Sequence, residues 1–423
     1  MPSRCLPSRV RAHARAQIAA PLLVIAAVVA LAAATAAPAP ALPYAAPDGK
    51  VLVGVTGGRT VDGYVRAAGK PPAMFQFFVN WGQPFQYAYR RAQEARAGLM
   101  VHLSTYNGPG TRERITPRDI AQGQGDRYLS SLTRRFAAHG RPVYLRPFGE
   151  MNNAANPYSA YSANGKSRGS AHDPLWFRQA WRRLYLVLKG GPVATIDARL
   201  HALGMPRLGS TATRSGWLPR PKVALQWTPM TAGSPNVAAN GPDRYWPGSG
   251  YVDWVGTDFY SRFPNFSGLD RFYATKQYAG KPFVFGEWAM WGRDDAGFIR
   301  RFFQWVAAHP RVKMLAYNQG NRPTSPFRLY RYPRSSRVMR QALRSPRYAG
   351  RPARPPHRRA RSGRAAAVAA PRYGQARRLL IRPTLASAVS EPATILDLSL
   401  IDRLLAAVVR IFDAVLALLG TAT

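Results

Sequence analysis

The chain is poor in the residues that build metal and redox centres. Its 423 residues include one cysteine, Cys5, which lies in a segment that we expect to be removed, and seven scattered histidines. This excludes a disulfide scaffold, a cysteine-ligated zinc site, an iron–sulfur cluster and a cysteine nucleophile in the mature chain. Because no group of potential ligands has the spacing of a metal site, we expect neither a metal nor any other cofactor.

Acidic residues are also scarce. The chain has 20 Asp and Glu against 60 Lys and Arg, which gives a net charge of +40 at pH 7. Such a charge favours polyanionic partners, but no nucleic-acid-binding motif accompanies the basic segments, so nucleic acid is not the expected partner. Neither a Gly-x-Gly-x-x-Gly nor a Walker pattern follows the first apolar run of the main domain, which leaves nucleotide binding without support. Apolar residues make up 46% of the chain, enough to bury a core.

The N-terminus has the composition of a targeting segment. Residues 1–17 carry four arginines and no acid, residues 18–34 are apolar, and small residues and prolines follow. This order is typical of a secretory signal, which we place at residues 1–41. The alternative is an uncleaved anchor, because about 18 apolar residues can span a bilayer. In both cases the following domain is exported, so we predict a secreted protein or one held at the cell surface or membrane.

The C-terminal region divides into two parts. Residues 351–390 are rich in Arg, Pro and Ala, which predicts a disordered basic linker. Its charge would attract an anionic envelope or membrane surface, or it is a solvated tail. Residues 391–423 predict an amphipathic helix that would lie on a membrane, contact a partner helix or fold back on the main domain. We expect the protein to be a monomer.

The middle of the chain, residues 45–350, predicts a single catalytic domain. Short apolar runs alternate with segments of helical spacing, and several runs are apolar throughout, as in strands buried on both faces. Eight such runs over about 300 residues predict a (β/α)8 TIM barrel, with a doubly wound open sheet as the alternative. The predicted strands are 51–55, 74–79, 98–103, 142–147, 222–227, 252–260, 282–285 and 313–318.

Two glutamates stand at matching places in this pattern. Glu150 follows the fourth predicted strand and Glu287 the seventh, each directly after a glycine. Catalytic residues of a (β/α)8 barrel lie at the carboxyl ends of its strands, so these side chains can converge across the mouth. Two facing carboxyls predict retaining glycoside hydrolysis, in which Glu287 stays ionised with donors from Arg146 and Tyr260, and Glu150 holds a proton. The alternative is that each glutamate is a loop acid paired with one of the many arginines.

Five segments occur in series between residues 50 and 320. They are Ile120–Asp126, Arg146–Asn153, Gln226–Pro229, Tyr245–Tyr260 and Phe285–Trp288. In this order they resemble segments of glycoside hydrolase family 26, the β-mannanase-like family. The resemblance implies a retaining (β/α)8 enzyme, endo-β-mannanase-like, that cleaves a β-linked polysaccharide. It also implies that Glu150 is the acid/base, that Glu287 is the nucleophile and that Tyr260 orients the nucleophile.

The chain departs from the family pattern beside the acid/base. Gly149 stands where the family has a His, and the family's Trp shortly after this segment is absent. Both departures concern the sugar-binding floor, so they bear on which sugar is bound. Mannan, mixed-linkage glucan, xylan and an acidic polysaccharide all stay open as substrates.

Aromatic and polar residues near the strand ends are expected to bind the substrate. The apolar face of a pyranose rests on an aromatic ring, although core packing is the alternative for each ring. Two other functions stay open: an inactive carbohydrate-binding barrel, and an envelope-binding protein whose C-terminal region is the functional part. The predicted substrate-binding residues are Trp81, His102, Arg146, Asn152, Trp227, Trp246, Tyr260 and Trp288.

Overall fold

The computed structural model of the protein describes residues 46–47, 49–107, 112–208 and 215–351. The predicted signal (1–41) and the predicted amphipathic helix (391–423) lie outside these ranges, as does the predicted basic linker apart from Arg351. Within the described ranges, no helix combines the length and the apolarity that crossing a membrane requires.

Eight parallel strands close into a barrel, which confirms the predicted (β/α)8 fold. They are ordered β1-β2-β3-β4-β7-β8-β9-β10, and β10 pairs with β1 to complete the ring. The short strand β11 (Tyr348–Ala349) also pairs with β1. Each predicted strand is present, with ends shifted by at most a few residues. The barrel strands are β1 (Val51–Thr56), β2 (Met74–Asn80), β3 (Gly98–Ser104), β4 (Val143–Pro147), β7 (Val223–Trp227), β8 (Trp254–Tyr260), β9 (Phe283–Ala289) and β10 (Val312–Asn318).

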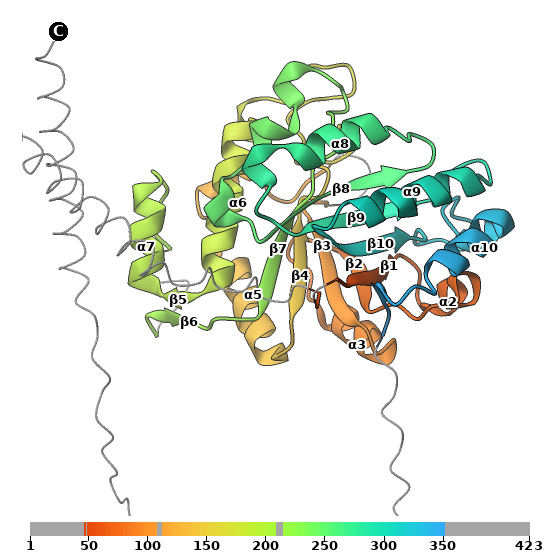
Figure 1. Ribbon diagram of the computed structural model, residues 1–423. Coiled ribbons are helices and arrows are strands. Elements are labelled where there is room, and N and C mark those ends of the chain that lie inside the picture. The colour runs from red at the N-terminus through yellow and green to blue at the C-terminus, as the bar shows by residue number, and fades with distance from the viewer. Residues whose placement is uncertain (1–45, 48, 108–111, 209–214, 352–423) are drawn as a thin grey trace, which may run out of the picture. The chain divides into compact units, whose positions relative to one another are not determined.

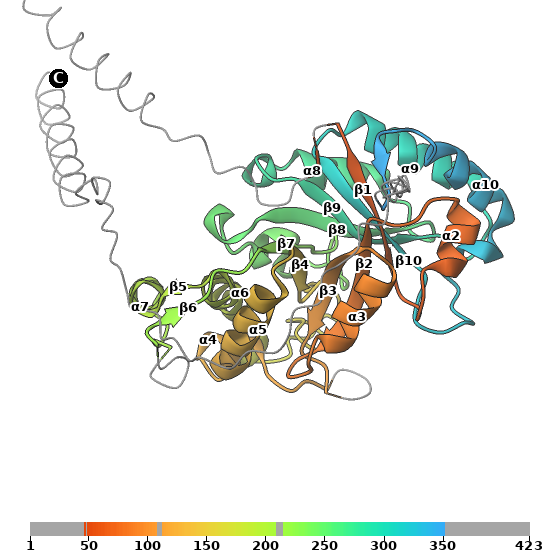
Figure 2. The ribbon, with the colours of Figure 1, turned by 90° about the horizontal axis from the view of Figure 1, so that it is seen from below.

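Helices cover the outside of the barrel (Figure 1, Figure 2). Local sequence sets where they begin: Asp173 caps the helix that starts at Pro174 by accepting a hydrogen bond from the Leu175 N–H at 2.7 Å. A small antiparallel pair, β5 (Gly191–Pro192) and β6 (Trp217–Leu218), lies apart from the barrel sheet. The helices are α2 (Asp62–Ala68), α3 (Gln86–Glu94), α4 (Pro117–Ala121), α5 (Asp126–His139), α6 (Pro174–Lys189), α7 (Val193–Ala202), α8 (Phe266–Ala274), α9 (Ala296–Ala308) and α10 (Pro333–Ala342).

Successive side chains of each strand point alternately into and out of the barrel, which divides them into an inner and an outer set. The outer set packs under the helices in the main hydrophobic core. The inner set starts with an apolar layer that includes Met100 on β3 and Tyr144 on β4. Two residues further along these strands, the buried inward positions are His102 and Arg146. The barrel interior is therefore apolar at its amino end and becomes polar and titratable toward its carboxyl end.

Candidate active site

Glu150 and Glu287 lie at the carboxyl end of the barrel. Glu287 is in the last part of β9, and Glu150 comes three residues after the end of β4. Burial and, after it, the negative charge of Glu287 raise the pKa of Glu150. The two carboxyl groups therefore interact electrostatically, as their places at the mouth of one barrel require.

Three donors hold the carboxylate of Glu287. Arg146 Nη1 donates to Oε1 at 2.6 Å, and both the Tyr260 hydroxyl and Asn318 Nδ2 donate to Oε2 at 2.7 Å. Burial by itself would raise the pKa of Glu287, but the charge of Arg146 and the hydrogen bonds outweigh burial and lower the pKa to about 2. Glu287 is therefore an ionised, well-oriented carboxylate near neutral pH.

Arg146 is the cation at the centre of the site. Its side chain is fully buried, and besides Glu287 it pairs with Asp258 and donates from Nε to Thr228 Oγ1 at 2.6 Å. A planar guanidinium can serve these partners at once because its donors point in fixed, separate directions, which an ammonium group does not offer. Arg146 thus places one positive charge beside two carboxyl groups and fixes their positions.

Gly149, the residue that departs from the family pattern, has a steric role here. A Cβ at this position would lie 2.5 Å from the guanidinium carbon of Arg146, and a Cβ at Gly286 would lie 2.7 Å from Arg146 Nε. No side chain fits at these distances unless Arg146 moves. The two glycines therefore let the backbone of the strand ends approach the buried guanidinium closely.

The loop after β4 holds Glu150 in a strained backbone conformation. Phe148 and Glu150 have φ angles of 51° and 53°, a left-handed conformation that costs roughly 1–2 kcal/mol per non-glycine residue. The Glu150 N–H donates to the Thr228 carbonyl at 2.8 Å, and Asn156 Nδ2 donates to the Glu150 carbonyl at 2.9 Å. Asn153 Nδ2 donates to Glu150 Oε2 at 2.8 Å. These contacts compensate the strain and aim the carboxyl group.

Glu150 and Asp258 share one proton. Their carboxyl groups are hydrogen-bonded to each other, and burial raises the pKa of both. Asp258 Oδ1 accepts from the backbone N–H of Glu287 at 2.8 Å, and Oδ2 pairs with Arg146. These donors stabilise the ionised form of Asp258. The hydrogen bond between the two carboxyl groups lowers the pKa of Glu150 and raises that of Asp258, so the proton belongs to the pair, while burial and the charge of Glu287 still leave the pKa of Glu150 raised.

His102 connects the nucleophile to the loop that carries Glu150. Its Nδ1 lies 3.5 Å from Arg146 Nη1 and 3.8 Å from Glu287 Oε1, and its Nε2 lies 3.2 Å from the Tyr158 hydroxyl. Burial lowers the pKa of His102, so the ring is neutral. The Tyr158 hydroxyl donates to the Gly149 carbonyl at 2.7 Å and therefore accepts from Nε2–H, which leaves Nδ1 as an acceptor for Arg146.

The structure corrects the prediction that Arg146 and Asn152 bind substrate. Arg146 is fully buried beneath the carboxylates that it pairs with. Asn152 is also fully buried, and its side chain donates to the Met230 carbonyl at 3.1 Å and accepts from the Met230 N–H at 2.9 Å. It ties the loop after β4 to the loop after β7. The neighbouring residue, Asn153, is the one that reaches the carboxyl group of Glu150.

Trp227 and Trp288 also belong to the core, contrary to the prediction that they bind substrate. Each directly follows an inward-facing residue, Gln226 or Glu287, so alternation along the strand directs the indole outward, under the helices. Their exposed fractions are 0% and 1%, and Trp288 stacks on an aromatic ring of α9 with a centroid separation of 4.2 Å. A ring without accessible surface cannot lie against a sugar.

Trp81 and Trp246 also contact other aromatic rings, but they are buried to different extents. Trp81 is buried and its ring contacts Tyr128 at a centroid separation of 5.0 Å. Trp246 is half-buried, and its ring lies 4.9 Å from that of Trp227 and 4.8 Å from that of Tyr278. The burial of Trp81 corrects the prediction that it binds substrate, whereas Trp246 keeps accessible surface and its part in substrate binding stays a prediction. Tyr260, in contrast, lies where the resemblance implies, on Glu287.

Several residues of the site escaped the sequence analysis. Asn318, Asn153 and Thr228 hold the carboxyl groups and Arg146, but an Asn or Thr at a strand end has no distinctive pattern. Phe78 was also missed, although the sequence carries a signal for it. It stands two residues beyond the inward-facing Gln76, its side chain is 39% exposed, and its ring centroid is 5.2 Å from that of His102. Alternation alone would have placed this aromatic ring at the mouth.

Comparison with known proteins finds solved structures of low similarity. No family model matches the chain, and no curated protein matches it. Similar solved structures include GH26A from a Muricauda species, with a TM-score of 0.47 and 16% identity over 72% of this chain and 92% of that chain. For a GH26 β-mannanase from Bacteroides ovatus, the TM-score is 0.46 and the identity is 16%, over 71% of this chain and 90% of that chain. For a Bacillus subtilis mannanase, the TM-score is 0.42 and the identity is 18%, over 70% of this chain and 86% of that chain. Identities and TM-scores this low leave the function to be inferred from the site itself.

Proposed function

We propose that the protein is a retaining glycoside hydrolase of the family 26 type. The observation that carries this proposal is the contrast between two carboxyl groups at one barrel mouth. Glu287 is held ionised, with its pKa lowered to about 2, whereas burial and the charge of Glu287 raise the pKa of Glu150. Two carboxyl groups whose pKa values are shifted in opposite directions are suited to the two roles of glycoside hydrolysis, nucleophile and proton donor.

In the first step, Glu287 is the nucleophile and Glu150 is the acid. A carboxylate oxygen of Glu287 forms a bond to the anomeric carbon while the bond from that carbon to the leaving oxygen breaks. The proton of Glu150 passes to the leaving oxygen, so the aglycone departs as a neutral alcohol. The hydrogen bond between Asp258 and the Glu150 carboxyl group supports this transfer, because it positions the proton donor.

In the second step, water releases the sugar. Glu150, now a carboxylate, takes a proton from water as the water oxygen attacks the anomeric carbon and the ester bond to Glu287 breaks. Arg146, Tyr260 and Asn318 then receive the regenerated carboxylate of Glu287 through hydrogen bonds of 2.6–2.7 Å. The same donors orient the nucleophile before the first step, which is the role implied for Tyr260.

The substrate in this proposal is a β-linked polysaccharide, cleaved in the manner of an endo-β-mannanase. The aromatic side chains near the mouth that are accessible to a sugar include Phe78, exposed beside His102, and Trp291, half-buried beside Tyr260. They take the place of the buried tryptophans as candidate stacking rings. We further propose that the chain is exported, on the strength of the signal pattern in residues 1–41.

Two glutamine substitutions test the proposal. Glu287→Gln removes the nucleophile and Glu150→Gln removes the transferable proton, so each should lower kcat on β-1,4-linked mannan, glucan or xylan oligosaccharides by more than about 10²-fold. Glu94→Gln on the outer helix α3 is the matched control and should retain full activity. For the wild-type chain, NMR of the first-formed sugar should show retention of the anomeric configuration. Full activity of both variants, or inversion of configuration, would refute the mechanism.

A further inference from the structure

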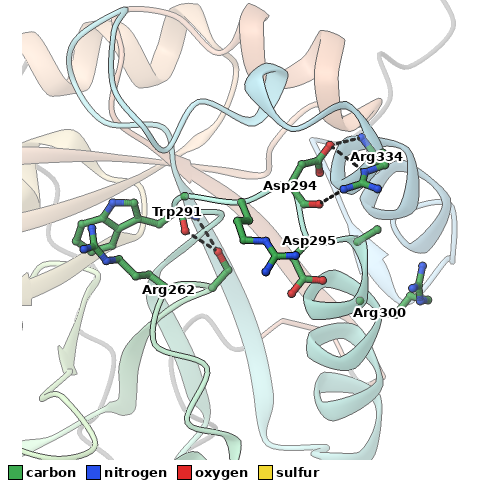
Figure 3. A pocket seen from close by; sticks show the side chains of 11 residues that line it. Arg262, Trp291, Asp294, Asp295, Arg300 and Arg334 are labelled. Carbon is green, nitrogen blue, oxygen red and sulfur yellow. Dashed lines mark hydrogen bonds and ion pairs between the residues drawn. The ribbon is translucent and has the colours of Figure 1, made fainter.

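A cavity lined by arginines lies beside the candidate active site, on the same face of the barrel. It has a volume of about 620 Å³, within the usual range of ligand sites. The loops after β8 and β9 and the first turns of α9 and α10 form its walls, and Figure 3 shows the main side chains. The lining residues are Ser261, Arg262, Trp291, Gly292, Arg293, Asp294, Asp295, Ala296, Gly297, Arg300 and Arg334.

Three of the four arginines in this cavity keep their charge available. Arg262, Arg293 and Arg300 are exposed, and among the described residues no carboxylate lies within ion-pair distance of any of them. Arg262 lies over the ring of Trp291, 5.0 Å from its centroid, which holds the guanidinium beside an aromatic surface. The cavity therefore offers cationic groups to a ligand.

The two acids of the cavity are already engaged by the protein. Asp294 accepts hydrogen bonds from the Ser335 hydroxyl at 2.6 Å and from the Arg334 N–H at 2.8 Å, and these donors lower its pKa although burial opposes them. Asp295 caps α9 by accepting from the Phe298 N–H at 3.0 Å. Because both carboxylates serve the ends of helices, they do not neutralise the other three arginines.

The cavity is connected to the nucleophile through two aromatic rings. The ring of Trp291 lies 5.8 Å from the ring of Tyr260, whose hydroxyl donates to Glu287 at 2.7 Å. A glycan with one sugar above Glu287 would therefore extend over Trp291 toward the arginines. Trp291 can stack on a sugar ring while Arg262 reaches a carboxylate carried by that sugar.

The basic rim continues beyond this cavity. A second cavity of about 560 Å³ is lined by Arg59, Arg66, Arg322 and Arg328 on the segments that follow β1 and β10. Strands β8, β9, β10 and β1 are consecutive neighbours in the barrel. The arginines therefore follow one continuous sector of the rim, which suits a chain of charged sugars better than a single small anion.

From this arrangement we infer that the substrate is an acidic glycan, with carboxylate-bearing sugars bound by the arginine-lined cavity beside Trp291. The inference rests on the proposed function and names its substrate class. Arginine favours this ligand because its planar donors match a carboxylate bidentately. A neutral mannan would leave the arginines of this sector without counter-charges.

A matched pair of substrates tests the inference on the full chain. β-1,4-linked mannohexaose and the corresponding hexamannuronate differ only in the carboxylate that replaces each hydroxymethyl group. We expect kcat/KM to be at least about tenfold higher for the hexamannuronate, and this advantage should shrink as salt is raised above about 0.1 M. A sulfated mannohexaose forms a further arm: cleavage equal to that of the hexamannuronate indicates recognition of any anionic glycan, and slower cleavage indicates preference for carboxylate.

Arginine substitutions locate the effect. Arg262→Gln and Arg293→Gln should each lower kcat/KM for the hexamannuronate by at least about fivefold and leave that for mannohexaose within about twofold. Arg141→Gln, at the opposite end of the barrel and two residues before β4, is the matched control and should change neither value. The inference is overturned if both substrates are cleaved equally well, if Arg141→Gln has the same effect, or if a DNA oligonucleotide of equal charge competes as well as hexamannuronate.

Failure of the inference and failure of the proposed function give different results. Cleavage of mannohexaose without a preference for the acidic substrate would leave the hydrolase proposal intact and refute the acidic substrate. If neither oligosaccharide is cleaved, calorimetry still decides the inference: hexamannuronate should bind the wild-type chain and lose affinity in Arg262→Gln. Equal binding of mannohexaose in that measurement would overturn it.

Discussion

At the scale of single residues, one buried guanidinium organises the site. Arg146 pairs with both Glu287 and Asp258 and is itself inaccessible to solvent. Removing one member of such a buried network is costly, by about 3–5 kcal/mol, because the remaining charges lose their compensation. This explains why an arginine that the sequence suggested as a sugar ligand instead sets the ionisation of two carboxyl groups.

Asp258 should determine how the activity depends on alkaline pH. The proposed mechanism needs Glu287 ionised and Glu150 protonated. Since the pKa of Glu287 is lowered to about 2 and that of Glu150 is raised, activity should stay constant through mildly acidic pH and fall as pH rises through the pKa of Glu150. Asp258→Asn removes a nearby negative charge and supplies an amide donor to the Glu150 carboxylate, so it should lower that pKa and move the alkaline limb to lower pH.

The measurement is kcat/KM as a function of pH for the wild type and Asp258→Asn, in the same buffers. Asp243→Asn, an exposed aspartate in the loop between β7 and β8, is the matched control and should leave the profile in place. An alkaline limb that does not move, or moves to higher pH, in Asp258→Asn would contradict the shared proton. Equal loss of activity at every pH would assign Asp258 a purely structural role.

At the scale of elements, the strand ends approach Arg146 only because two of them carry glycine. Gly149→Ala places a Cβ 2.5 Å from the Arg146 guanidinium, so we expect a loss of about 1–3 kcal/mol in unfolding free energy and a loss of activity as Arg146 shifts. Gly149→His, which introduces the residue that glycoside hydrolase family 26 has at this place, should be at least as harmful. Chemical denaturation and kcat/KM on the same substrate measure both effects.

Gly250 provides the control for that experiment. A Cβ added to this glycine meets no heavy atom within 4 Å, so Gly250→Ala should leave stability within about 0.5 kcal/mol of the wild type. If Gly149→His were as stable as the wild type and more active, Arg146 would have another accessible position, and the steric explanation of Gly149 would be wrong.

The strands were predictable from the sequence, whereas the direction of side chains at their ends was only partly so. Runs buried on both faces give a strong signal, and all eight were found. Trp227 and Trp288 were misassigned because only their place at the end of a strand was considered. Side chains along a strand point alternately into and out of the barrel, and this alternation directs both indoles outward. The roles of Asn152 and Asn153 were not predictable, because Phe148 and Glu150 have a left-handed backbone. Side chains after them no longer follow the inward and outward alternation of the strand.

At the scale of the whole molecule, basic residues are abundant both in the barrel region and in the segment that follows it. Residues 45–350 contain 44 basic and 16 acidic residues, and one sector of the barrel rim concentrates arginines around two cavities. The segment beyond Arg351 adds further arginines. If the rim binds an acidic glycan, the basic tail can hold the enzyme at an anionic surface where such polymers occur. Catalysis and attachment would then use separate cations.

A truncation tests this separation. Arg351 is the last described residue, and it is anchored to the barrel, since its N–H donates to the Pro71 carbonyl at 3.0 Å and the preceding β11 pairs with β1. A chain that ends at Arg351 should therefore keep kcat/KM within about twofold and its melting temperature within about 2 °C of the full chain. Fractionation of cells that produce each form should find the full chain associated with the envelope and the truncated chain in the medium. Equal envelope association of both forms would place the attachment on the barrel, and cytoplasmic retention of both would contradict export directed by residues 1–41.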